Sequence, residues 1–169
     1  MKIGQAEIEK LIAGMADALA SKLRSAGRGE LLVIGIHTGG VWVAERLRRR
    51  LGVDAPLGEL NIAFYRDDFS RIGIHPEVRP SRLPLMVDDR HLVLVDDVLH
   101  TGRTIRAAMN EIFDWGRPAS ISLAVLVDRG GRELPIQADI VGKSLSLRDD
   151  EHVKLSGPEP LALEITGTG

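Results

Sequence analysis

Two adjacent carboxylates precede a loop of small and polar residues in the stretch 92–104, which reads LVLVDDVLHTGRT. Asp96 and Asp97 follow an apolar run of the kind that forms a buried strand. Because removing a carboxylate from water is costly, we expect both side chains to project from the edge of that strand toward water, hydroxyl groups or a cation. A polyol or a metal-bound ligand would satisfy such a pair.

The loop that follows carries groups that bind phosphate. A helix predicted to begin near Gly102 would present free backbone N–H groups and the positive end of its dipole to an anion. Thr101 and Thr104 add hydroxyl donors, and Arg103 adds a positive charge. Taken singly, these features have ordinary explanations, since one Asp can cap a helix and Thr-Gly can form a plain turn. Together they exceed what capping needs and predict a phosphate site beneath a polyol site.

The elements that must position these groups alternate along the chain. Helices are predicted over residues 6–23, 41–52 and 101–116, and strands over 31–36, 59–65, 91–97 and 119–128. The alternation favours an α/β fold with a parallel sheet and helices on both faces. Ligands of such sheets bind beyond the carboxyl ends of the strands, which is where the two carboxylates stand. No Walker-type phosphate loop and no GxGxxG fingerprint follows a predicted strand.

Length and composition indicate one globular domain, 1–169. The chain has 169 residues, 44% hydrophobic and 27% charged residues, no Cys and a net charge of -2 at pH 7. The absence of Cys excludes thiol chemistry, and so small a net charge does not by itself indicate a polyanionic partner. The N-terminal residues are charged throughout, and no apolar run approaches the roughly 18 residues of a membrane span. We therefore expect a cytoplasmic protein that does not enter a membrane.

The stretch VLVDDVLHTGRT resembles the phosphoribosyl pyrophosphate (PRPP) signature of type I phosphoribosyltransferases. FYRDDFS and LAVLVDRGGRELPIQADIVGK are similar to segments of the PyrR group, whose members are pyrimidine operon attenuators and uracil phosphoribosyltransferases. The resemblance covers nearly the whole chain. Hypoxanthine, orotate and adenine enzymes share the signature, so it identifies the donor, and the two narrower segments favour uracil as the acceptor.

The resemblance implies a three-layer fold, in which helices flank a central, mostly parallel sheet beside a small β-rich hood at about 129–169 and a flexible lid at about 66–84. It implies conversion of uracil and PRPP to UMP and pyrophosphate with Mg²⁺, in a homodimer or higher homo-oligomer. Two alternatives stay open. One is a UMP-responsive RNA-binding attenuator, with or without residual activity, and the other is a purine phosphoribosyltransferase.

By resemblance, Asp96 and Asp97 face the ribose hydroxyls and the metal, which they would reach through water or through PRPP. The 5′-phosphate contacts would be Val98, Leu99, His100, Thr101, Gly102, Arg103 and Thr104. The pyrophosphate contacts would be Thr38, Gly39, Gly40 and Arg79, with Arg66 of the lid among the catalytic residues. The base contacts would be Arg129, Ile140 and Val141.

Each of these assignments has a plainer alternative. The glycines after Thr38 can form a tight turn, and residues 139–141 can form a buried strand. Arg79 can be an ordinary solvated charge. Arg129 and Arg132 can pair at the surface with Glu133 and Asp128 rather than line a pocket.

Two departures from the related enzymes bear on the function. Gly39 stands where the PyrR group often has Arg, which leaves the pyrophosphate affinity open. His100 stands where purine enzymes have an acid, which weakens the purine alternative. A neutral His could share a proton of uracil, although a solvent-facing His is the commoner explanation.

RNA binding is less favoured by the sequence. RNA-binding relatives have Arg and His where this chain has Gly14 and Asp17, and another His where it has Gly131. Lys143 is retained as a candidate RNA contact. The basic cluster at 46–50 could contact phosphates, but a solvated helix face is the usual explanation of such a run. We therefore predict an enzyme first and an attenuator second.

Overall fold

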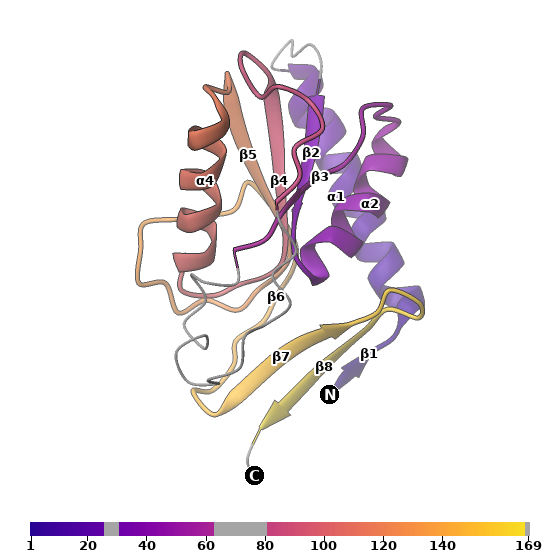
Figure 1. Ribbon diagram of the computed structural model, residues 1–169. Helices are drawn as coiled ribbons and strands as arrows, with labels where there is room; N and C mark the ends of the chain where they lie inside the picture. The colour runs from indigo at the N-terminus through magenta and orange to yellow at the C-terminus, as the bar shows by residue number, and fades with distance from the viewer. Residues whose placement is uncertain (26–30, 63–80, 168–169) are drawn as a thin grey trace.

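The structure is a computed structural model that describes residues 1–25, 31–62 and 81–167. Its main sheet has five parallel strands in the order β3-β2-β4-β5-β6 (Figure 1). The strands are β2 (Leu31–Ile36), β3 (Gly58–Leu60), β4 (His91–Leu99), β5 (Ser120–Asp128) and β6 (Ile140–Ser144). The β-branched and leucine-rich runs of β2, β4 and β5 are buried on both faces, as parallel strands covered by helices require.

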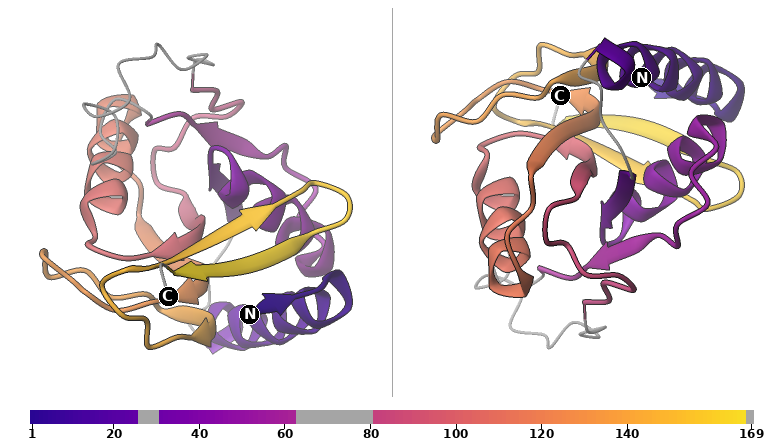
Figure 2. Two further views of the ribbon diagram at one scale, coloured as in Figure 1. Left: turned by 90° about the horizontal axis from the view of Figure 1, so that it is seen from below. Right: turned by 90° about the horizontal axis from the view of Figure 1, so that it is seen from above.

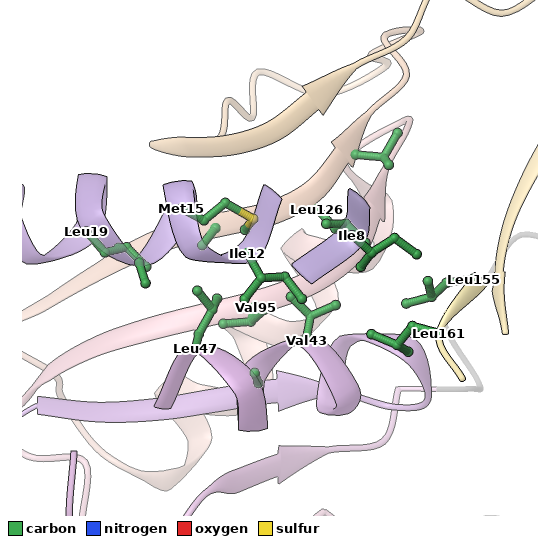
Figure 3. Packing of buried hydrophobic residues seen from close by; sticks show 14 of the residues in the cluster. Ile8, Ile12, Met15, Leu19, Val43, Leu47, Val95, Leu126, Leu155 and Leu161 are labelled. Atoms are coloured by element: carbon green, nitrogen blue, oxygen red, sulfur yellow. The ribbon is translucent and has the colours of Figure 1, made fainter. Parts of the chain in front are cut away.

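Helices cover both faces of this sheet. Figure 1 shows α1 (Gln5–Ser25) and α2 (Gly39–Leu51) on one face and α4 (Arg103–Trp115) on the other. Apolar residues of α1 recur at three- and four-residue steps, so Ile8 and Ile12 point to one side and meet Val43 and Leu47 of α2 over Val95 of β4 (Figure 3). The predicted α/β fold with helices on both faces is confirmed.

A second, antiparallel sheet lies at the end of the molecule where the parallel strands finish (Figures 1 and 2). It has the order β1-β8-β7 and consists of β1 (Lys2–Ile3), β7 (Glu151–Ser156) and β8 (Ala162–Gly167). β7 and β8 are the β pieces expected in the hood. The pairing of Lys2 with Glu164 was not predicted, because it joins residues from opposite ends of the chain.

Several predicted boundaries differ from the structure. Helix α2 begins at Gly39, two residues early, and β4 runs on to Leu99, so both carboxylates lie before the end of the strand rather than at it. β6 belongs to the main sheet and not to the hood. Of the strand predicted over 59–65, the structure has β3 up to Leu60, and residues 63–65 lie outside the described part of the chain.

Most of the predicted lid, residues 66–80, also lies outside the described residues, and Arg66 and Arg79 lie with it. Its last residues belong to the body of the protein instead. The backbones of Glu59 and Arg82 exchange two hydrogen bonds of 2.8 and 2.7 Å, and Leu83 is buried. Within the described residues, no helix combines the length and the apolar character needed to cross a bilayer.

Candidate active site

A cavity of about 540 Å³ opens where β4 ends and α4 begins. It is lined by residues of the loop between them and by a few residues from later in the chain: Asp96, Asp97, Val98, Leu99, His100, Thr101, Gly102, Thr104, Ile105, Arg129, Glu133, Asp149 and His152. The stretch selected from the sequence therefore forms most of one cavity. Among residues 96–104, Arg103 is the one that does not line the cavity as the described residues form it.

The loop enters α4 at Gly102, as predicted. Gly102 has a φ of 92°, in the left-handed region that favours glycine, and it makes no side-chain capping hydrogen bond. The N–H groups in the first turn of a helix have no partner within the helix, so this end of α4 can receive an anion. Thr101 Oγ1 accepts a hydrogen bond from the Arg103 N–H at 3.2 Å. Arg103 itself pairs with Glu133, with 2.7 Å between Nε and Oε2.

The two carboxylates do not share one environment. Asp96 is only 3% exposed, so of the surroundings expected for it, open water is wrong, although the residue lines the cavity. Its Oδ1 accepts the Asp97 N–H at 2.9 Å, and this hydrogen bond offsets part of the cost of burial. Asp97 is half-buried, and its Oδ1 accepts the Val98 N–H at 3.0 Å. Asp97 is therefore the more accessible of the two.

The predicted pyrophosphate residues lie directly beside these carboxylates. Gly39 and Gly40 are buried in the first turn of α2, and Thr38 caps that helix without a side-chain hydrogen bond. A Cβ on Gly40 would lie 2.7 Å from the Val95 carbonyl oxygen, and one on Gly39 would lie 2.8 Å from the Asp97 Cγ. The helix can start this close to β4 only because neither residue has a side chain. The N-terminus of α2 thus lies against Asp96 and Asp97, although Thr38, Gly39 and Gly40 are not among the described residues that line the cavity.

Of the three predicted base contacts, only Arg129 is among the described residues that line this cavity. Arg129 lines it, and its Nε is buried without a hydrogen-bond partner among the described residues. Ile140 and Val141 are absent from the described lining. They border a separate groove of about 420 Å³ against α1. Their assignment to the base came from the family resemblance, and the strand β6 that carries them pairs with β5 at the edge of the main sheet.

Asp149 and His152 line the cavity from the start of the hood, and the sequence analysis missed both. His152 belongs to β7, and Asp149 precedes that strand by two residues. The available signal was a carboxylate and an imidazole at the beginning of a short β piece. Their position over the loop depends on how the hood folds back, which no local pattern reports.

His100 is held by the loop that follows β5. Its Nδ1 lies 2.9 Å from the Gly130 carbonyl oxygen, and since a carbonyl only accepts, Nδ1 carries the proton of this hydrogen bond. His100 is exposed, as a solvent-facing His would be, and it also lines the cavity.

Arg132 pairs with Asp128, as the plainer alternative supposed. Burial by itself would raise the pKa of Asp128, but hydrogen bonds from Arg132 and from the Gly130 N–H outweigh it and hold that pKa below its ordinary value.

The basic cluster on α2 is paired with acids. Arg46 contacts Glu9 and Glu159, Arg48 and Arg49 contact Glu45, and Arg50 contacts Glu9. Hydrogen bonds from Arg48 are the main reason that the pKa of Glu45 lies below its ordinary value. The candidate RNA contact Lys143 has its Nζ 3.8 Å from Glu7 Oε1. The plainer explanation of this cluster, a helix face with compensated charge, therefore fits it.

Comparison with known proteins gives the family. Residues 4–159 match the phosphoribosyl transferase domain. The bifunctional protein PyrR of Nitrosococcus oceani is 61% identical over 160 residues, which cover 94% of this chain and 90% of that protein. The bifunctional protein PyrR of Pseudomonas aeruginosa is 59% identical over 155 residues, which cover 92% and 91%.

Solved structures agree on the fold. The hypoxanthine phosphoribosyltransferase of Trypanosoma cruzi superposes with a TM-score of 0.65 at 22% identity, covering 85% of this chain and 79% of that one. At this identity the likeness concerns the fold alone, which is that of type I phosphoribosyltransferases. The extent and identity of the sequence matches go further: the chain belongs to the phosphoribosyltransferases and, among them, to the PyrR family.

Proposed function

We propose that this enzyme transfers the phosphoribosyl group of PRPP to uracil and releases pyrophosphate. In this reaction the bond from the anomeric carbon to pyrophosphate breaks, a bond to a ring nitrogen of uracil forms, and that nitrogen loses its proton. Positive charge develops on the ribose and negative charge on the leaving group. The protein must therefore orient both substrates and exclude water, and it needs no covalent nucleophile.

The 5′-phosphate of PRPP occupies the loop 98–104 in this proposal. The N-terminal N–H groups of α4 and the hydroxyls of Thr101 and Thr104 are the donors that a phosphate dianion requires. The missing side chain of Gly102 lets the loop pack against the later segment, since a Cβ there would lie 3.2 Å from the Ile136 Cβ. Arg103 supports the loop through its contact with Glu133 and adds positive charge nearby.

The ribose and the pyrophosphate lie between Asp97 and the start of α2. Asp97 is the more accessible carboxylate, so it accepts hydrogen bonds from the ribose hydroxyls. The buried Asp96 fixes the position of the Asp97 backbone by accepting its N–H. The N–H groups of Gly39 and Gly40 face the leaving pyrophosphate. Arg66 and Arg79 keep their proposed roles in the lid, outside the described residues.

Magnesium fits this site as an ion carried by the substrate. The described residues contain no group of three or more potential ligands for a metal, and Asp96 and Asp97 supply two carboxylates. Mg²⁺ is commonly held by one or two carboxylates together with substrate phosphates and waters. When bound, it would neutralise charge that builds up on the pyrophosphate. The two Asp residues would orient its water ligands.

The uracil ring lies toward Arg129, Asp149 and His152, and Ile140 and Val141 stay predicted base contacts. The unpartnered Nε of Arg129 is a donor that a uracil carbonyl can accept from. Asp149 can accept from a ring N–H, and His100 keeps one nitrogen free to take part in proton exchange, because the other is engaged by Gly130. This polar set is suited to the alternating carbonyl and N–H edge of a pyrimidine.

One observation supports the proposal: in a chain of the PyrR family, one cavity is lined by the loop after β4, the two carboxylates and Arg129, whose Nε has no partner among the described residues. The test is PRPP consumption with uracil, hypoxanthine, guanine, adenine and orotate side by side in the presence of Mg²⁺. We expect pyrophosphate release with uracil. Turnover with a purine and none with uracil would overturn the assignment.

RNA-dependent attenuation ranks below the enzyme, although the relatives are called bifunctional. Gly14 and Asp17 stand on an exposed part of α1, and the charges of the α2 cluster are compensated by acids. RNA binding through phosphates needs Lys and Arg side chains that can neutralise phosphates and so release the counterions of the RNA. A cytoplasmic location and a homodimer or higher homo-oligomer stay predictions.

A further inference from the structure

The loop that would hold the 5′-phosphate rests on the segment that follows β5. The Arg129 N–H donates to the Leu99 carbonyl at 3.1 Å, and the N–H groups of Glu133 and Leu134 donate to the Thr101 carbonyl at 2.9 and 3.2 Å. Together with the His100 contact to Gly130, these bonds tie residues 99–101 to residues 129–134. Residues 129–134 thus hold the backbone of residues 99–101 in position.

Arg132 is the centre of this support. Its guanidinium donates three hydrogen bonds: from Nε to the Ile136 carbonyl at 2.8 Å, from Nη1 to the His100 carbonyl at 2.9 Å, and from Nη2 to Asp128 Oδ2 at 2.6 Å. One side chain therefore joins the end of β5, the segment after it and the phosphate loop. Arg132 does not itself line the described cavity.

These contacts leave Arg132 little freedom. Its side chain is 24% exposed and that of Asp128 is 22% exposed, so the ion pair is shielded from most of the solvent. Asp128 is fixed in turn by the Gly130 N–H at 2.9 Å. A planar guanidinium spreads its donors over three nitrogens in a fixed fork, so it reaches acceptors on three segments, whereas an ammonium group carries its three donors on one nitrogen.

We propose that Arg132 is a positioning residue for the phosphate-binding loop: it holds the His100 carbonyl, and through it residues 100–102, in the geometry that receives the 5′-phosphate. This inference rests on the proposed function, because it assigns the phosphate to that loop. Without the guanidinium, the His100 carbonyl loses its donor and the loop samples other positions. Affinity for the phosphate then falls, because part of the binding free energy goes into ordering the loop.

The experiment measures binding of ribose 5-phosphate to the full chain by calorimetry, with melting temperatures and initial rates recorded in parallel. We expect Arg132→Gln to weaken ribose 5-phosphate binding about tenfold, a change of about 1.4 kcal/mol. The KM for PRPP should rise by a similar factor while the KM for uracil changes by less than about threefold, since most of the contacts proposed for uracil, at Arg129, Asp149 and His152, lie outside this loop. Relative to Arg132→Gln, Arg132→Lys should restore the melting temperature more than the affinity for ribose 5-phosphate. Lysine keeps the positive charge beside Asp128 but lacks the forked guanidinium that also reaches the His100 carbonyl.

Arg46 provides the matched control. It is 14% exposed in its side chain, pairs with Glu9 and Glu159, and donates to the carbonyls of Trp42 and Pro158, so it joins three segments away from the cavity. Arg46→Gln should lower the melting temperature and leave ribose 5-phosphate binding unchanged. Equal weakening in both Gln variants, or unchanged binding in Arg132→Gln, would overturn the inference.

The design separates this inference from the proposed function. If wild type releases no pyrophosphate with any base, the proposed function fails, and the binding data still decide the role of Arg132. If Arg132→Gln does not fold, the comparison is made with Arg132→Lys, for which unchanged affinity for ribose 5-phosphate would overturn the inference.

Discussion

Replacing Gly39 by Ala tests whether the orientation of Asp97 matters for turnover. The new Cβ would lie 2.8 Å from the Asp97 Cγ and closer still to its Oδ2, so the carboxylate must rotate away. That rotation breaks the hydrogen bond from the Val98 N–H to Oδ1, which contributes about 1 kcal/mol. Ala in the first turn of a helix returns a similar amount, about 1 kcal/mol, through its higher helix propensity. The free energy of unfolding should therefore stay within about 1 kcal/mol of wild type.

Activity should respond much more strongly. Displacing a substrate-orienting group by about 1 Å can cost about a hundredfold in rate. We therefore expect turnover of PRPP with uracil to fall by about 10- to 100-fold in Gly39→Ala. Initial rates and urea unfolding of the same preparations provide the two measurements.

Gly40→Ala is the control for this experiment. Its Cβ would lie 2.7 Å from the Val95 carbonyl oxygen and 3.0 Å from the Asp96 Cα, and backbone atoms cannot rotate away as a side chain can. We expect destabilisation of about 1–3 kcal/mol, as for other overpacked sites. Wild-type turnover in Gly39→Ala would refute the reasoning, and so would a stability loss in that variant as large as in Gly40→Ala.

Three further predictions address the carboxylates, the charge network and RNA. Asp97→Asn and Asp96→Asn should lower turnover about a hundredfold or more while the melting temperature changes little; unchanged turnover in both would remove them from the reaction. Hydrogen bonding to Arg48 holds the pKa of Glu45 below its ordinary value, so ionised Glu45 stabilises the fold fully above its unfolded-state pKa of about 4.3, and this stability is lost as the pH falls through the lower folded-state pKa. The stability difference between wild type and Glu45→Gln should accordingly shrink between about pH 6 and about pH 3 in urea titrations, and a constant difference would contradict this. A pyrimidine-operon leader hairpin and a scrambled hairpin of equal length should bind weakly and alike at two salt concentrations, with or without UMP; tight, UMP-enhanced discrimination between them would make the regulator the primary function.

The sequence by itself determined the main elements and the chemistry of the loop. The run at 31–36 is β2 with the predicted bounds, and α4 begins one residue after Gly102. These features depend on neighbours in the chain: apolar spacing selects a helix or a strand, and glycine marks the turn between them. The order of strands and helices then places the ends of the parallel strands at one edge, which is why Asp96 and Asp97 could be assigned to a site.

Burial of an individual polar residue could not be predicted in the same way. Asp96 and Asp97 are identical and adjacent, yet one is enclosed and the other is accessible. Both residues line the same cavity, and the start of α2 touches each of them, with Gly39 against the Asp97 carboxylate and Gly40 against the Asp96 backbone. How deeply each is covered depends on this packing of α2 against β4, which joins segments that are distant in the sequence.

The far side of the site was decided by tertiary structure alone. Asp149 and His152 reach the cavity because the hood folds across the ends of the parallel strands, and its sheet is completed by β1 from the other end of the chain. Arg132 supports the loop through contacts with His100, which lies 32 residues earlier. Such contacts join segments that are distant in the sequence, so no periodicity or motif encodes them. They follow from the way the sheet and the hood are packed, which is the part of the site that the chain acquires only on folding.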